Sequence, residues 1–128
     1  MLQSQVRGRV AVDRSAAEIE LLLAANASVS LRLNPDQLLG LIQAFGQLRA
    51  DLVAGQLVPS LKGAQVSAVV NPKWLVERDA VGQASVFSFQ HPAFGPVGCV
   101  LPPDQVRSLT SLLSEHVDLT RVAGGKPQ

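Results

Sequence analysis

Few side chains in this sequence combine the residue types and spacing that catalysis requires. Cys99 is the single cysteine and could act as a nucleophile beside a histidine base, and His91 and His116 are the only histidines. Nothing in their spacing predicts that these three residues meet in a catalytic or metal site. The alternating pattern around Cys99 assigns it to the inward face of a strand, where a cysteine behaves as a small apolar residue. We therefore predict that Cys99 is buried and inert.

The acidic residues also have a structural interpretation. Asp36 and Asp104 each follow a proline at the expected start of a helix, where a negative charge stabilises the helix dipole. The chain has no phosphate-binding loop, dinucleotide-binding motif, zinc-protease motif or hydrolase motif. We therefore predict a non-catalytic protein that holds no cofactor and no metal.

Basic and aromatic residues indicate a binding role instead. Arg7, Arg9 and Arg32 are expected on the outer faces of strands, where guanidinium groups can hold phosphates. Trp74 could stack on a base, and His91 lies in the predicted turn "QHPAFG". These five residues are the candidate contacts with a nucleic acid or a protein partner, and a small-molecule site near Trp74 and His91 is a further interpretation.

The elements that would position these residues come from an internal repeat. The stretch "VSLRLNPDQLLGL" at 29–41 returns as "VGCVLPPDQVRSL" at 97–109, an offset of 68 residues without a gap. Such self-similarity indicates that the chain contains the same structural unit twice. In each copy an alternating strand runs into a helix, whose start is marked by Asn34 and Pro35 in the first copy and by Pro102 and Pro103 in the second.

The segments upstream of each strand–helix pair are also expected to be strands. Residues 5–12 alternate, and residues 16–25 fit either a helix, with Ser15 and Glu18 as a capping box, or a strand. Their counterpart "VFSFQH" favours a strand, so we predict a strand in both copies. The stretch "AQVSAVV" at 64–70 alternates as one more strand, which "NPK" at 71–73 should bend or interrupt.

The predicted fold class is α+β, with antiparallel strands followed by one helix, βββα or ββββα, twice. We expect residues 1–121 to form a single domain of two repeats, about 5–53 and 65–121, which share a core across a pseudo-twofold axis. Residues 122–128 are expected to form a flexible tail.

The composition of the chain limits the classes of function that it can have. The 128 residues are 47% hydrophobic and only 16% charged, with a net charge of +1, which favours self-association over duplex binding. The N-terminus does not resemble a signal peptide, and no apolar run reaches the length of a membrane span, so we expect a cytoplasmic protein without membrane contact. The favoured function is a protein-interaction or assembly module that forms a homodimer, and the alternative is a single-stranded DNA- or RNA-binding regulator.

The strand-to-helix motif resembles one known family. "LRLNPDQL" at 31–38 and "CVLPPDQV" at 99–106 are similar to the C-terminal element of the single-strand-binding transcriptional positive-cofactor family. The related Whirly and Pur proteins combine strands and a helix in each unit and have two units per chain. The resemblance implies binding of single-stranded nucleic acid on an antiparallel sheet.

Overall fold

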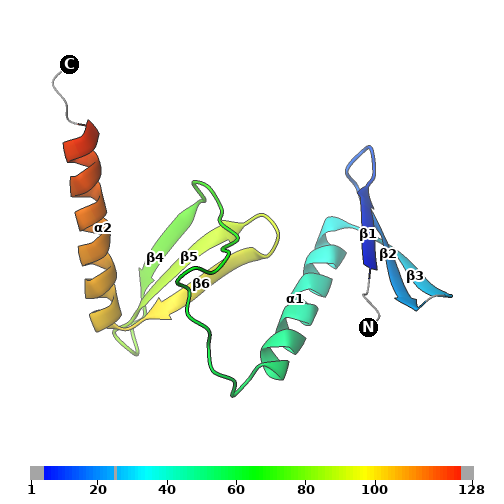
Figure 1. The fold of residues 1–128 in the computed structure, drawn as a ribbon, viewed down its shortest axis with the longest axis horizontal. Helices are drawn as coiled ribbons and strands as arrows, with labels where there is room; N and C mark the ends of the chain where they lie inside the picture. The colour runs from blue at the N-terminus through cyan, green and yellow to red at the C-terminus, as the bar shows by residue number, and fades with distance from the viewer. Residues whose placement is uncertain (1–4, 25, 125–128) are drawn as a thin grey trace. The chain divides into compact units, whose positions relative to one another are not determined.

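The computed structural model of this protein describes residues 5–24 and 26–124, which form one βββα arrangement twice (Figure 1). The first copy contains β1 (Gln5–Val10), β2 (Ala17–Ala24), β3 (Ala27–Leu33) and α1 (Pro35–Leu52). The second contains β4 (Trp74–Arg78), β5 (Ser85–His91), β6 (Gly95–Leu101) and α2 (Pro103–Gly124). The predicted α+β repeat is confirmed in its three-stranded form.

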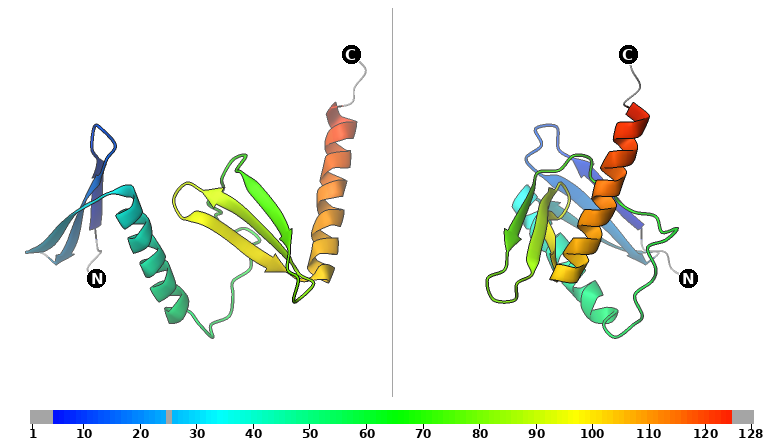
Figure 2. Two further views of the ribbon diagram at one scale, coloured as in Figure 1. Left: turned by 180° about the vertical axis from the view of Figure 1, so that it is seen from behind. Right: turned by 90° about the vertical axis from the view of Figure 1, so that its left-hand side faces the viewer.

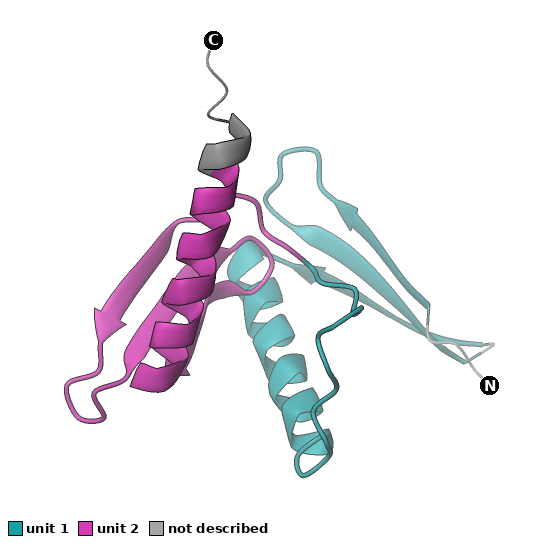
Figure 3. Ribbon diagram, turned by 60° about the vertical axis from the view of Figure 1, so that its left-hand side comes forward, with its two compact units in different colours: residues 1–67 teal, residues 68–128 magenta. Residues whose placement is uncertain are grey.

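The chain divides into two compact units, residues 1–67 and 68–128 (Figure 3). Unit 1 holds an antiparallel sheet in the order β1-β2-β3, and unit 2 holds one in the order β4-β5-β6. Each sheet is therefore a simple meander, in which consecutive strands are hydrogen-bonded neighbours.

Strand register repeats with the same offset as the sequence. In unit 1, Ile19 of β2 pairs with Gly8 on one side and Leu31 on the other. Sixty-eight residues later, Phe87 of β5 pairs with Val76 and Cys99. The loops agree as well, because both six-residue loops, 11–16 and 79–84, close with a backbone hydrogen bond from their first to their last residue. The two sheets therefore have the same strand pairing at equivalent positions of the repeat.

The ambiguous segment 16–25 contains a strand, as the repeat predicts. The capping-box interpretation fails because Ser15 bonds elsewhere: its backbone N–H and its hydroxyl both donate to the Asp13 carboxylate, at 3.1 and 2.7 Å. Glu18 is consequently not a helix residue but lies in β2, between β1 and β3.

Two predicted boundaries differ from the structure. No strand lies between α1 and β4, so the strand expected within 64–70 is wrong. An alternating segment becomes a strand only where a neighbouring strand satisfies its backbone groups, and Pro72 ends this segment without an N–H to donate. At the C-terminus, α2 continues to Gly124, so residues 122–124 are helical where a flexible tail was expected. Residues 125–128 lie outside the described part of the chain.

Helix α1 begins at a complete capping box. The Gln37 backbone N–H donates to Asn34 Oδ1 at 2.8 Å, and the Asn34 backbone N–H donates to Gln37 Oε1 at 3.0 Å. Pro35 at the first helical position costs no hydrogen bond, because the first N–H groups of a helix have no intrahelical partner. In α2 the equivalent of Asn34 is Pro102, whose side chain offers no acceptor.

This difference between the helices predicts opposite effects of two substitutions. Asn34→Ala should lower the free energy of unfolding by about 1 kcal/mol, because it removes the cap of α1. Pro102→Asn should raise it by up to about 1 kcal/mol, because Gln105 stands where Gln37 does and can complete a second capping box. Urea denaturation followed by circular dichroism measures both. A loss of stability in Pro102→Asn would show that the cap geometry of α1 is not shared by α2.

Apolar side chains in both units remain mostly uncovered. Among the described residues, Ala84 alone is a buried hydrophobic residue, at 8% exposure. Each helix follows its last strand after a single residue and then runs away from its own sheet, as Figures 1 and 2 show. In α1 the residues of the first turns, Leu38, Leu41 and Ile42, are half-buried, whereas Phe45, Leu48 and Leu52 further along are exposed. The sheet of a unit is therefore not covered by the helix of that unit.

Candidate interaction surfaces

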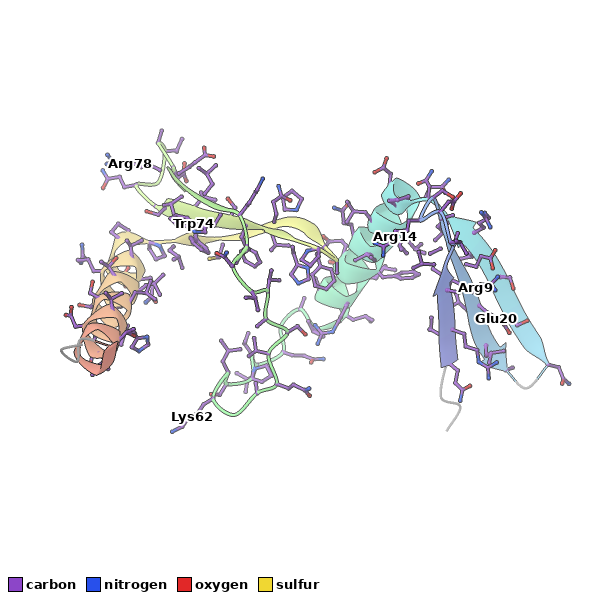
Figure 4. All side chains as sticks on the ribbon, turned by 90° about the horizontal axis from the view of Figure 1, so that it is seen from above. Arg9, Arg14, Glu20, Lys62, Trp74 and Arg78 are labelled. Atoms are coloured by element: carbon purple, nitrogen blue, oxygen red, sulfur yellow. The ribbon has the colours of Figure 1, made fainter. Side chains whose placement is uncertain are left out.

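One face of the β1–β3 sheet carries charged side chains, and we call it the charged face. Six polar residues from all three strands lie at its centre: Arg7, Arg9, Glu18, Glu20, Ser30 and Arg32. They line a shallow, open depression of about 470 Å³. Figure 4 shows Arg9 and Glu20 on this sheet. The structure therefore brings the three predicted arginines together on one face.

Two carboxylates, which were not among the predicted contacts, accompany these arginines on the charged face. Glu18 lies between Arg9 and Arg32, with its two oxygens 2.6 and 2.8 Å from their guanidinium nitrogens. Glu20 pairs in register with Arg7. The charged face thus holds three positive and two negative groups. The signal for this was present in the alternation, which puts Glu18 and Glu20 on one side of their strand.

The ion pairs lower the pKa of Glu18. The hydrogen bond from Arg9 contributes most to this shift, and the positive charges of Arg9 and Arg32 add to it. The pKa of Asp13 is also lowered, chiefly by the hydrogen bond from the Ser15 hydroxyl. Both acids are ionised near neutral pH.

These shifts predict a loss of stability in acid. A carboxyl whose folded-state pKa is depressed stabilises the fold above its unfolded pKa, near 4.5 for Glu18, and loses that contribution as the pH falls through the folded value. Chemical denaturation of the wild type and of Glu18→Gln, from about pH 6 to about pH 3, should show a difference in stability that shrinks as Glu18 is protonated. A difference that is constant over this range would contradict an ionic role for Glu18.

The β4–β6 sheet presents a different surface, which we call the aromatic face. Its central residues are Trp74 and Val76 of β4, Phe87 and Phe89 of β5, and Val97 and Cys99 of β6, and the register adds Arg78, Ser85 and Leu101 at one end. The ring centroids of Trp74 and Phe87 lie 6.1 Å apart, and those of Phe87 and Phe89 lie 6.4 Å apart. Trp74 is nevertheless 65% exposed, because nothing within unit 2 covers this face. Figure 4 shows its side chain on the sheet.

His91 continues the aromatic row and has a structural task. Its ring lies 6.4 Å from that of Phe89 and stacks on that of Phe94 at 4.4 Å. His91 Nδ1 accepts hydrogen bonds from the backbone N–H groups of Ala93 and Phe94, at 3.0 and 3.3 Å. The imidazole therefore holds the turn between β5 and β6, and Nδ1 is not available to a ligand. Trp74 and His91, both predicted contacts, belong to one row of rings.

Cys99 corrects the prediction that it is buried. It lies on the aromatic face opposite Phe87, as the alternation predicts, yet it is exposed because that face is uncovered. His91 pairs with Gly95, four residues further along the same two strands, which is about 13 Å away and too far for a nucleophile and its base. Within residues 5–24 and 26–124, no three His, Cys, Asp or Glu side chains are grouped to hold a metal ion.

The β1–β3 sheet has an uncharged surface opposite the charged face, which we call the aliphatic face. It consists of Val6, Gly8, Val10, Ala17, Ile19, Leu21, Val29, Leu31 and Leu33. Val6 and Val10 at its edge are exposed. The helices add two apolar stripes: Leu38, Leu41, Ile42, Phe45, Leu48 and Leu52 on α1, and Val106, Leu109, Leu113 and Val117 on α2. Each unit therefore has at least one apolar sheet face and one apolar helix stripe that the unit itself does not cover.

The repeat is broken on the other side of the second sheet. There Leu75, Val86 and Val100 occupy the positions that Arg7, Glu18 and Arg32 occupy in the first. Gly98 replaces Ser30. Glu77 occupies the position of Arg9 and is the one charged side chain on this side. The two sheets thus share their register, but only the first gathers several charged side chains on one face.

Neither α1 nor α2, as far as the structure describes them, has an apolar stretch of the length that crossing a membrane requires. Comparison of the chain with models of known protein families, with curated proteins and with solved structures found no match.

Proposed function

We propose that this protein is a non-catalytic assembly module, whose apolar sheet faces and helix stripes bind a protein partner. The observation that carries the proposal is that the helix of each unit does not cover the sheet of that unit (Figure 1). Ala84, at 8% exposure, is the only buried hydrophobic residue among those that the structure describes.

The chemistry of these surfaces fits a protein partner. The aliphatic face and the two helix stripes contain no charged side chain, and Arg78 at one end of the aromatic face is the single charged residue there. Burying apolar area stabilises an association by about 25 cal/mol per Å², and leaving such patches in water favours aggregation. A partner that covers these surfaces with its own apolar side chains would both stabilise the association and prevent aggregation.

The mass of the particle in solution tests this proposal. Sedimentation velocity of the purified chain, alone and with proteins that copurify under native conditions, should give a mass above 13.5 kDa. A compact particle with the mass of one chain at every concentration would overturn the proposal. Such a chain would cover its own apolar surfaces and would need no partner.

Binding of single-stranded DNA or RNA is a second candidate function. It is favoured by the gathering of Arg7, Arg9 and Arg32 on one sheet face, and it is weakened by Glu18 and Glu20 between them. Carboxylates at 2.6–2.8 Å from the guanidinium groups compete with phosphate oxygens for the same donors.

Removing Glu18 is the sharpest test of this candidate. If the charged face binds phosphates, Glu18→Gln should tighten binding of labelled single-stranded DNA or RNA, because Arg9 and Arg32 then become available to the backbone. The variant should also steepen the salt dependence, and Arg9→Ala should weaken binding. Fluorescence anisotropy over a salt series measures each. Absence of binding by both wild type and Glu18→Gln at low salt would exclude this function for the charged face.

A further inference from the structure

We infer that His91 makes the turn between β5 and β6 a pH-sensitive switch, which is closed while the imidazole is neutral and opens when the ring takes up a proton. The inference goes beyond the proposed assembly function and does not depend on it, because every part of the switch lies within unit 2. Opening of the turn changes the end of the aromatic face that His91 and Phe94 form.

The hydrogen bonds of this turn converge on one atom. The turn consists of Pro92, Ala93 and Phe94, between the paired residues His91 and Gly95. Pro92 has no backbone N–H, so Ala93 and Phe94 carry the only N–H donors of the turn. Both donate to His91 Nδ1, at 3.0 and 3.3 Å. A single ring nitrogen therefore accepts from both N–H groups that the turn contains.

This arrangement requires the neutral imidazole, with its hydrogen on Nε2. A protonated imidazole carries a hydrogen on each ring nitrogen and has no acceptor left. Its Nδ1–H would point at the N–H groups of Ala93 and Phe94, so the ring and the turn must separate. The Phe94 ring, at 4.4 Å, attracts an imidazolium. That attraction does not keep the turn closed, because a ring stacked in this place holds Nδ1–H against the same two N–H groups.

The charged residues of the second sheet lie away from the His91 ring. Glu77 and Arg78 are the last two residues of β4, and Arg78 pairs with the first residue of β5, about 20 Å from His91 at its end. Lys73 is nearer, and its carbonyl accepts the Gln90 N–H at 2.9 Å, but it lies opposite Gln90 and so on the other side of the sheet. Helix α2 begins after the far end of β6. Within the described part of unit 2, the response to pH therefore comes from the His91 proton itself.

The internal repeat limits the switch to the second hairpin. Leu23 occupies the position of His91 in unit 1, and its side chain has neither an acceptor nor an exchangeable proton. The two hairpins pair alike as far as Leu22, but the register of unit 1 then shifts and Ala24 lies opposite Ala27. The amides at the end of the first hairpin therefore serve as an internal reference that lacks the switch.

Nuclear magnetic resonance of the full chain from about pH 8 to about pH 5 tests the inference, because histidine takes up its proton in this range. The backbone amide signals of Ala93 and Phe94 should move with the same midpoint as the signals of the His91 ring. The ratio of closed to open turn should fall by up to about tenfold for each pH unit, since one proton is coupled to opening. His116, exposed in α2, titrates in the same spectra and should leave the two amides unmoved.

Two variants separate the effect of the proton from that of the ring. His91→Asn supplies a side-chain oxygen that can accept from the N–H groups two and three residues further on and that does not titrate. Its turn should stay closed over the whole pH range. His91→Phe keeps an aromatic ring but removes the acceptor, so its turn should be open at every pH.

Amide signals of Ala93 and Phe94 that follow the His91 titration in the wild type, and stay fixed in His91→Asn, support the switch. Signals that do not respond between about pH 8 and about pH 5, or that respond equally in His91→Asn, overturn it. If His91→Phe does not fold, the wild type and His91→Asn still decide. These results leave the assembly function untouched, because that function is tested by the mass of the particle in solution.

Discussion

Replacing Gly98 with alanine is expected to destabilise unit 2 by about 3 kcal/mol, since forcing extra atoms into an occupied space costs about 1–3 kcal/mol or more. A Cβ atom at this position would lie 2.6 Å from the carbonyl oxygen of Phe87 and 3.0 Å from the Cβ of Ser88, in the neighbouring strand β5. The Phe87 oxygen is a backbone atom, and the Ser88 Cβ is attached directly to the backbone. Rotation of a side chain therefore cannot relieve the clash. Urea denaturation of the variant, followed by Trp74 fluorescence, measures the loss.

Gly40→Ala is the control for this prediction. Gly40 lies in α1, and a Cβ there would have nothing within 4 Å. Alanine is the better helix former by about 1 kcal/mol, so this variant should be more stable than the wild type. If Gly98→Ala were as stable as the wild type, β5 and β6 would have to pair more loosely than the structure shows.

Phe45→Glu is expected to weaken the proposed assembly, with a rise in the dissociation constant of about 100- to 1,000-fold. Phe45 is 56% exposed in an isolated copy, so a glutamate meets water there and α1 still forms. In the proposed assembly, Phe45 stands in the middle of the α1 stripe that the partner covers, and burial of an unpaired carboxylate costs several kcal/mol. Sedimentation equilibrium at several concentrations gives the change directly.

The matched variant for Phe45 is Gln43→Glu. Gln43 is exposed two residues earlier in α1, on the side of the helix opposite the apolar stripe. The same charge at this position should leave the dissociation constant within about twofold of the wild-type value, as is usual for surface substitutions. Equal effects of the two variants would mean that net charge, and not the stripe, controls association.

Local chemistry made parts of this fold predictable from the sequence. The start of α1 follows from Asn34, Pro35 and Gln37, whose hydrogen bonds involve only near neighbours. The strand β2 could not be assigned in this way, because its residues also suit a helix. It was predicted correctly only because Phe87 and Phe89 occupy the same positions in the second copy.

Other features depend on partners that are distant in sequence. The alternating residues 64–70 form no strand, since alternation shows which side chains would share a face but supplies no neighbouring strand. Cys99 lies on the predicted face and is still exposed, because burial depends on what covers that face. The alternation places Glu18 on one side of its strand, but only the register of three strands shows that Glu18 lies between Arg9 and Arg32 and pairs with both.

The break in the repeat has a consequence for how this protein can change over evolutionary time. In an assembly of single βββα units, every substitution appears on every sheet. Here two sheets of one register are encoded separately, so one outer side could keep Arg7, Glu18 and Arg32 while the other acquired Leu75, Val86 and Val100. The two copies can therefore change independently on this side while they keep one register. A single chain carries two chemically distinct sheet surfaces, and each can adapt to its own neighbour.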